Sequence, residues 1–221
     1  MKIIFIDTTH PKLIKDLNYK GLICDQAHNK SRSEILKIIM NYDGIVIRSR
    51  FKIDKTFINA AKKLKFIARA GSGTENIDLH YANKKNIKCF NAAEGNRQAV
   101  AEHALAMILN LLNNIRVSDQ EMRKGIWTRE KNRGIELSGK TIGIIGFGNT
   151  GSSFAKILEN FNVKILAYDK YKEKYKFQSN LDEILEFSDI ISLHSPLIEE
   201  TKYLVNENFI DNAKKPYYII N

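Results

Sequence analysis

The chain has 221 residues, of which 43% are hydrophobic, so it is long and apolar enough to bury one large core or two moderate ones. No window approaches the roughly 18 uninterrupted apolar residues of a membrane helix, and the N-terminus opens on a strand pattern, Lys2–Ile6, which excludes a membrane protein and predicts a cytoplasmic one. The formal net charge of +10 suits nucleic acid, but most lysines fall on polar positions of predicted helices or in loops, as solvated lysines do.

Short apolar runs alternate with helical patterns along the chain, which is typical of parallel sheets built from βαβ units. Ser33, Asp54 and Asp78 stand where helices need an N-cap. Cys24 and Cys89 lie in apolar runs, so we predict neither a disulfide nor a nucleophile. We expect strands at Ile3–Asp7, Gly21–Cys24, Gly44–Ser49, Lys65–Ala70, Lys88–Asn91, Thr141–Gly146, Lys164–Asp169, Asp189–His194 and Tyr217–Asn221.

The segment Arg97–Lys124 differs from the other predicted helices, because its first half is apolar almost all the way round. Such a helix is buried on several sides. A polar stretch, Arg129–Gly139, follows it and leads to a new strand with a glycine-rich turn. We therefore place the domain boundary near Asn96, with one domain in residues 1–96 and a second in residues 97–221.

The glycine-rich turn follows the predicted strand Thr141–Gly146 and precedes a predicted helix, Ser152–Asn160. Gly146 would allow the tight turn, Gly148 would let a pyrophosphate approach the backbone, and Gly151 would let the helix pack on the strand. The helix N-terminus supplies unpaired N–H groups and a partial positive charge for phosphates. This context predicts a dinucleotide site.

The next predicted strand ends in Asp169, 23 residues after Gly146, near the spacing expected for a ribose contact. Its carboxylate can accept hydrogen bonds from both adenosine ribose hydroxyls and would repel a 2′-phosphate, which favours NAD over NADP. The alternative is an ordinary tight turn with a surface aspartate. With strand, glycines, helix and acid all in place, we favour NAD binding.

Directly after Asp169, the stretch Lys170–Phe177 alternates basic and aromatic residues, which is the best indication of single-stranded nucleic-acid binding in the chain. The alternative is a surface loop whose lysines keep it soluble. We favour the surface loop and predict no nucleic-acid partner.

Longer motifs extend along nearly the whole chain, at Ile47–Ser49, Ile58–Leu64, Arg69–Asp78, Ala99–His103, Leu137–Thr141 and His194–Leu197. Together with the glycine turn, they resemble the D-isomer-specific 2-hydroxyacid dehydrogenases, and among these the 3-phosphoglycerate dehydrogenases. The resemblance implies an α/β protein with a flavodoxin-like substrate domain and a Rossmann-type, doubly wound NAD-binding domain that is truncated in its last strand region. It also implies an active site in the cleft between the domains.

The resemblance also implies roles for individual residues. Backbone N–H groups of the loop Gly71-Ser72-Gly73 would bind the substrate carboxylate. The two glycines make this role physically sensible, because successive backbone N–H groups can form an anion-binding concavity. Arg48 and Ser49 would reach the substrate from a strand end, and Asn96 would lie at the cleft. The residues that would contact the cofactor are Ser72, Gly146, Gly148, Asn149, Thr150, Gly151, Asp169 and Ser195, although position 150 is usually aliphatic in the family.

Several of these residues also have a structural interpretation. Arg48 could simply cap a strand end, and the glycines at 71 and 73 could only form a turn. Asn76 and Asp78 resemble a helix start, and we interpret both as structural.

Hydride transfer between an alcohol and a ketone needs a group that exchanges the hydroxyl proton, usually a histidine. His10, His28 and His80 lie in no motif, and His103 cannot face the adjacent Glu102 because successive helical residues point about 100° apart. His194 is expected at the cofactor rim or in a structural role. We therefore predict no catalytic residue and no metal site within this sequence. In the family the catalytic Arg, Glu and His follow the strand that matches Tyr217–Asn221, so we expect them beyond Asn221.

The predicted function is thus an NAD-dependent oxidoreductase that acts on D-3-phosphoglycerate at the entry to serine synthesis, where Arg48 and Arg129 would suit a phosphorylated substrate. A hydroxypyruvate, glyoxylate or D-lactate type reductase and a noncatalytic NAD-sensing protein stay open. A homodimer through the second domain is expected by resemblance.

Overall fold

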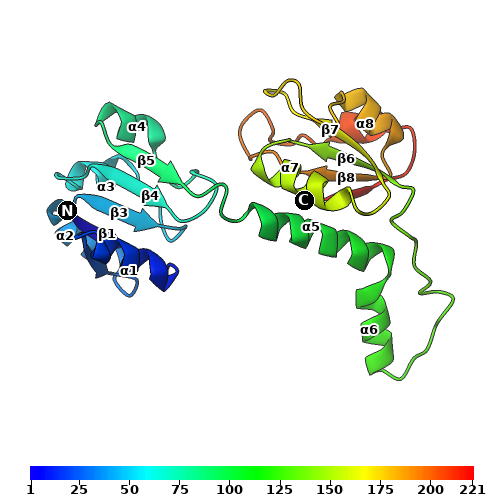
Figure 1. Ribbon diagram of the computed structural model, residues 1–221, viewed down its shortest axis with the longest axis horizontal. Coiled ribbons are helices and arrows are strands. Elements are labelled where there is room, and N and C mark those ends of the chain that lie inside the picture. Colours follow the sequence, from blue (N-terminus) through cyan, green and yellow to red (C-terminus); the bar gives the residue numbers. More distant parts are fainter. The chain divides into compact units, whose positions relative to one another are not determined.

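The computed structural model describes residues 1–221, which form two compact units, Met1–Gly95 and Asn96–Asn221. Each unit is built on one parallel sheet with helices on both faces (Figure 1). No helix combines the length and the apolar character needed to span a bilayer. Both cysteines are free and partly buried in strands.

Unit 1 has the strand order β2-β1-β3-β4-β5, which is the flavodoxin-like order predicted for it. Its strands are β1 Lys2–Phe5, β2 Ile23–Gln26, β3 Gly44–Ile47, β4 Phe66–Arg69 and β5 Lys88–Asn91. Its helices are α1 Pro11–Tyr19, α2 Arg32–Ile38, α3 Lys55–Ala60 and α4 Leu79–Lys84, with a 3-10 turn at Ile39–Asn41.

Successive strand residues of unit 1 face opposite sides of the sheet, and both sides are covered. Ile4 and Ile45 pack with Phe57 of α3 in one core cluster. Ile3 and Phe5 pack in the other cluster, on the side of α1. Burial on both faces explains the continuous apolar runs in the sequence.

Unit 2 has the strand order β7-β6-β8-β9. An isolated parallel bridge joins Ala167 of β7 to Gln178, so a reduced third strand flanks β7 and the order becomes that of a Rossmann sheet, 3-2-1-4-5. The strands are β6 Thr141–Ile145, β7 Lys164–Tyr168, β8 Ile190–Leu193 and β9 Tyr218–Ile220. The helices are α5 Arg97–Leu112, α6 Ile115–Arg123, α7 Asn149–Leu158, α8 Leu181–Phe187 and α9 Glu207–Asp211.

The two faces of the unit 2 sheet bury different helices. Ala104 and Ile108 of α5 share one cluster with Phe154 of α7. Ile184 of α8 and Phe209 of α9 share the cluster on the other face. The apolar first half predicted for Arg97–Lys124 is therefore explained by its packing on sheet and helix together.

The long predicted helix over 97–124 is wrong in one respect, because it is two helices. Asn114 adopts a left-handed conformation, with φ 52°, which ends α5 and redirects the chain into α6. Asparagine tolerates that conformation better than most residues. The helix after the glycine turn begins at Asn149, three residues before the predicted start, so the last three turn residues lie inside it.

Two further predicted boundaries are corrected. The N-cap of α2 is Ser31 and not Ser33, because Ser31 and Glu34 form a capping box in which each side chain accepts from the other residue's backbone N–H, at 3.3 and 2.7 Å. Strand β2 begins at Ile23, two residues later than predicted, because Gly21 has φ 76° in the preceding turn. Asp54 and Asp78 cap α3 and α4 as predicted.

Candidate functional site

A cavity of about 250 Å³ opens at the carboxyl ends of β6, β7 and β8 in unit 2. This edge is the point where the strand order reverses, and doubly wound sheets bind their ligands there. Gly146, Gly148, Asp169 and Ser195, which the sequence predicts as cofactor contacts, all line this cavity. The structure thus brings residues from three separate strands into one site.

The glycine turn after β6 permits close backbone approach at two positions. Gly146 has φ 94°, and a Cβ there would lie 2.7 Å from the backbone of His194 and Ser195. A Cβ on Gly151 would overlap the carbonyl oxygen of Gly146. These contacts confirm the backbone roles predicted for both glycines. A Cβ on Gly148, by contrast, would meet no atom within 4 Å, so space is open above the turn.

The N-terminus of α7 has unpaired donors beside that open space. Gly148 is the N-cap and has no capping side chain. The backbone N–H groups of Gly148, Asn149 and Thr150 donate no hydrogen bond within the protein. Unpaired N–H groups at a helix start, together with the helix dipole, bind anions such as phosphate.

The Asp169 carboxylate is held in a fixed position at the end of β7. Its Oδ2 accepts from the Phe147 N–H at 2.7 Å, and its Oδ1 accepts from the N–H groups of Tyr171 and Lys172 at 2.9 and 3.1 Å. The carboxylate therefore ties the glycine turn to the loop after β7. The carboxylate lines the cavity, and its Oδ2, which accepts only one hydrogen bond in the protein, can accept another from a ligand.

His194 follows β8 and lines the same cavity. Its ring is stacked at a tilt against Phe154, with centroids 5.3 Å apart, and its Nε2 lies 2.9 Å from the Ser192 hydroxyl. Burial lowers the pKa of His194 to about 4, so the ring is neutral at pH 7. This environment supports the prediction that His194 is a structural residue at the cofactor rim.

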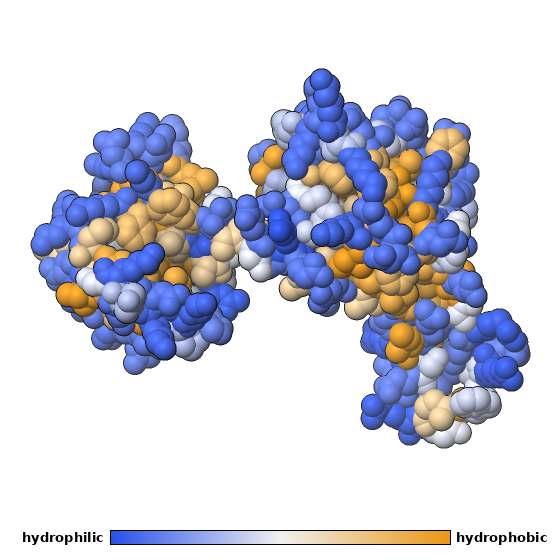
Figure 2. Space-filling model, viewed as in Figure 1, coloured by the Kyte–Doolittle hydropathy of each residue, from blue (hydrophilic) through white to orange (hydrophobic).

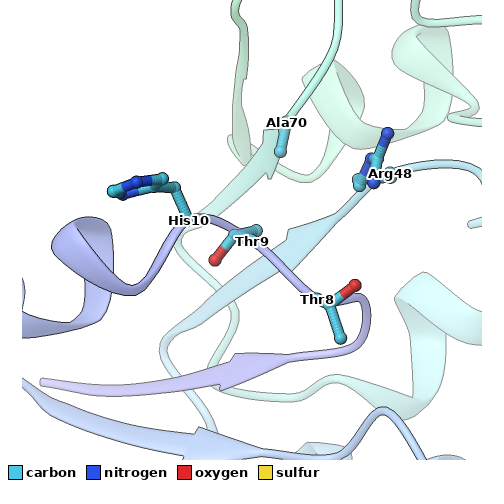
Figure 3. A pocket seen from close by; sticks show the side chains of 5 residues that line it. All are labelled: Thr8, Thr9, His10, Arg48 and Ala70. Carbon is cyan, nitrogen blue, oxygen red and sulfur yellow. The ribbon is translucent and has the colours of Figure 1, made fainter.

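Unit 1 has a cavity of its own, of about 370 Å³, at the carboxyl ends of β1, β3 and β4. Arg48 reaches it from the end of β3, and Ala70 from the end of β4 (Figure 3). The loop after β1 contributes Thr8, Thr9 and His10. Ser49 is exposed next to Arg48.

The predicted carboxylate-binding loop curls around an ion pair. Arg69 binds Glu75 at 2.8 Å, and a Cβ on Gly71 would lie 3.1 Å from the Arg69 guanidinium, while one on Gly73 would overlap the Glu75 carboxylate. The backbone N–H groups of residues 71 to 73 donate no hydrogen bond within the protein. The two glycines therefore leave room for the ion pair. The loop also has free N–H donors for an anion.

Asn96 is the N-cap residue of α5, and its side chain makes no capping bond. Its Oδ1 is buried and has no hydrogen-bond partner. Buried acceptors are rarely left unpaired, so this oxygen is available to an incoming donor.

Sequence reasoning missed several residues of both cavities. Tyr168, Lys170 and Glu200 line the unit 2 cavity, and Thr9 and His10 line that of unit 1. The loop after β1 could have been predicted to line the site, because residues that follow parallel strands meet at one edge of the sheet.

No three His, Cys, Asp or Glu side chains are grouped so as to hold a metal ion.

The aromatic residues of Lys170–Phe177 are divided between surface and core. Tyr175 stacks on Phe147, with ring centroids 4.7 Å apart, and Phe177 packs against the core. Tyr171 is exposed at the cavity wall. Two of the three aromatic rings are therefore occupied by packing within the protein.

Residues 105–221 match the family model described as "D-isomer specific 2-hydroxyacid dehydrogenase, NAD binding domain". A D-3-phosphoglycerate dehydrogenase of Archaeoglobus fulgidus is 34% identical over 227 residues, which cover all of this chain and 43% of that protein. A hydroxypyruvate reductase of Thermotoga maritima is 39% identical over 198 residues, 88% of this chain and 65% of the relative.

The solved structure of D-lactate dehydrogenase from Aquifex aeolicus, complexed with NAD and lactic acid, is similar at a TM-score of 0.84 and 27% identity. The match covers all of this chain and 68% of that one. The chain therefore spans less than half of the Archaeoglobus relative, and about two thirds of the other two proteins.

Proposed function

Because the chain belongs to the D-isomer-specific 2-hydroxyacid dehydrogenase family, we propose that it acts in the NAD-dependent interconversion of a D-2-hydroxy acid and its 2-oxo acid. The observation that carries this proposal is the uncapped N-terminus of α7 beside the fixed Asp169 carboxylate. The first suits a pyrophosphate and the second suits ribose hydroxyls. NAD would accept or donate the hydride.

In this proposal, unit 2 binds the cofactor through the residues predicted from sequence. The N–H groups of Gly148, Asn149 and Thr150 hold the pyrophosphate, while the ribose hydroxyls donate to Asp169. Ser195, which follows β8, forms part of the cavity wall. Each contact uses a group that the structure leaves free or fixes at the cavity.

Unit 1 binds the substrate in the same proposal. The free N–H groups of the Gly71–Gly73 loop hold the carboxylate, and the cavity lined by Arg48 takes the rest of the molecule. Ser49 is a further polar contact of unit 1. Asn96, the first residue of unit 2, is proposed as another through its unpaired Oδ1. These residues bind and orient, and no residue of the chain is assigned to proton transfer.

The proposed substrate is D-3-phosphoglycerate, and the proposed reaction belongs to cytoplasmic serine synthesis. Identity to the Archaeoglobus relative along the whole chain supports it, and so does an exposed arginine, Arg48, at the unit 1 cavity. The higher identity to a hydroxypyruvate reductase favours hydroxypyruvate as the second candidate. Oxidation of D-3-phosphoglycerate at C2 gives 3-phosphohydroxypyruvate, which differs from hydroxypyruvate by a phosphate, so a cation should distinguish the two substrates.

The test follows NADH absorbance of the full-length gene product with D-3-phosphoglycerate, hydroxypyruvate, glyoxylate and D-lactate. Arg48→Gln should lower kcat/KM for the phosphorylated substrate by about tenfold or more, because an arginine–phosphate pair is charge-assisted. Lys52→Gln, an exposed neighbour on the same loop, is the matched control. Absence of turnover with every 2-hydroxy and 2-oxo acid would contradict the proposal.

We also propose a homodimer formed through the arm of unit 2, which is α6 and the segment that follows it to Gly139. No residue of α6 is buried, yet Ile115 and Met122 are apolar, and Trp127 beyond them is 74% exposed. Apolar surface lies among hydrophilic residues at this end of unit 2 (Figure 2). Exposed apolar clusters of this kind mark protein interfaces.

The arm has a defined conformation, which a paired surface requires. Glu121 of α6 accepts hydrogen bonds from the Thr128 hydroxyl, from Lys131 at 3.0 Å and from Asn132 at 2.6 Å. These bonds, that of Thr128 first, lower the pKa of Glu121 to about 2. The segment is thus tied to α6 at neutral pH.

A further inference from the structure

Two lysines follow Asp169, and they have different surroundings. The Lys170 ammonium binds the carboxylate of Glu200, thirty residues further along the chain, and the Tyr171 hydroxyl donates to the other oxygen of that carboxylate. The Lys172 ammonium instead donates to the Phe147 carbonyl at 2.9 Å. Lys170 and Glu200 line the cavity of unit 2, and Lys172 does not.

Lys170 and Glu200 are both charged at neutral pH. The hydrogen bond to Glu200 raises the pKa of Lys170, and the bonds from Lys170 and Tyr171 lower the pKa of Glu200. Since His194 is neutral, Lys170 is the only cation on the cavity wall, which it shares with two carboxylates, those of Asp169 and Glu200. The wall beside the proposed ribose site therefore has a net negative charge.

We propose that Glu200 is a second determinant of NAD selectivity, which holds Lys170 in an ion pair and so withholds that cation from a 2′-phosphate. This inference rests on the proposed function. NADP differs from NAD by a phosphate monoester that carries a charge of about −1.5 to −2 at neutral pH and needs unpaired cations. NAD presents hydroxyls at the same place, which the Asp169 carboxylate satisfies without help from Lys170.

The pair works as a specificity device and not as a stabilising one. Both side chains are about half exposed, 56% for Lys170 and 40% for Glu200, and exposed pairs contribute little to folding. A cation released from such a pair can turn toward a neighbouring anion. Its effect should be screened by salt.

The test measures NADH and NADPH affinity of the 221-residue chain by fluorescence titration at low and high ionic strength. Glu200→Gln keeps a hydrogen-bonding side chain but removes the charge, and it should tighten NADPH by about tenfold and leave NADH within about threefold. The gain should shrink at high salt. Adding Lys170→Gln to Glu200→Gln should return NADPH affinity to that of the unmodified chain.

Glu199→Gln is the matched control, because it removes the same charge from the neighbouring residue, whose side chain is exposed and makes no hydrogen bond. If Glu200→Gln changes the NADPH to NADH ratio no more than Glu199→Gln does, the inference is wrong. It is also wrong if the double variant keeps the gain. Failure of the unmodified chain to bind either dinucleotide would instead contradict the proposed function, and the inference with it.

Discussion

Gly146 and Gly148 stand two residues apart in the turn after β6, but a methyl group would meet different surroundings at each. Gly146→Ala should lower the free energy of unfolding by about 1–3 kcal/mol, because φ is 94° and the new Cβ would press on the backbone of Ser195. Gly148→Ala should leave the Tm nearly unchanged, because the space beside it is empty. It should nevertheless weaken NADH binding, since the methyl group would occupy the phosphate space.

Thermal unfolding and NADH titration of both variants measure the two effects separately. Gly125→Ala, which also has a positive φ of 72° but no neighbour within 4 Å, gives the cost of the conformation alone. Unchanged NADH affinity in Gly148→Ala would mean that no phosphate lies over this turn.

The lowered pKa of His194 predicts that the protein loses stability in mild acid. Its folded pKa of about 4 lies below the ordinary value of 6.5, so the unfolded chain binds more protons between these two pH values. The contribution of His194 is therefore fully present above pH 6.5 and is lost as the pH falls toward 4. Between pH 7 and pH 5 the free energy of unfolding should fall by about 2 kcal/mol from this residue.

Urea denaturation at the two pH values checks this prediction, with His194→Phe as the comparison. The variant removes the ionisable group and keeps a ring against Phe154. Equal acid sensitivity of the two proteins would show that His194 titrates normally.

At the scale of elements, the sequence predicts what depends on neighbours in the chain. The positions of the strands along the chain and the capping residues Asp54 and Asp78 follow from local patterns. The break at Asn114 was missed because an asparagine in a left-handed conformation looks, in sequence, like any polar helix residue. The third strand of unit 2 is a single bridge at Gln178, too short to leave a pattern.

The arm of unit 2 has exposed apolar side chains, which predict a contact with a partner subunit. Ile115 and Met122 are seven residues apart on α6 and share one face. Replacing both with glutamate should convert the dimer to a monomer with little change in monomer stability, because neither side chain is buried. Sedimentation velocity at micromolar concentration measures the change, and Gln120→Glu on the opposite face is the control. An unmodified full-length protein that is already monomeric would contradict the proposal.

At the scale of the whole molecule, the net charge of +10 is predicted to serve solubility. Lysines of the Lys170–Phe177 stretch are partly neutralised, since Lys176 binds Glu159 at 2.6 Å and Lys170 binds Glu200. Binding of single-stranded DNA or RNA should therefore stay weaker than micromolar at physiological salt. Tight, salt-sensitive binding that disappears when Lys170, Lys172, Lys174 and Lys176 are neutralised would show the opposite.

The residues of the candidate site also differ in whether the sequence could predict them. The glycine turn and Asp169 could be predicted, because one strand–turn–helix and the end of the next strand define them. Glu200 could not be predicted, because its place beside Lys170 depends on how a loop thirty residues away packs. The unit 1 contacts of Arg48 depend likewise on the loop after β1.

Unit 2 is proposed to bind NAD and to select it through the Asp169 carboxylate. The direct test is a titration of the 221-residue chain and its Asp169→Ala variant with NADH and with NADPH, with Glu173→Ala, an exposed acid of the same loop, as control. We predict that the unmodified chain and the control bind NADH more tightly than NADPH, and that Asp169→Ala weakens NADH by about tenfold or more and removes the preference. Tighter binding of NADPH than of NADH by the unmodified chain would contradict the claim.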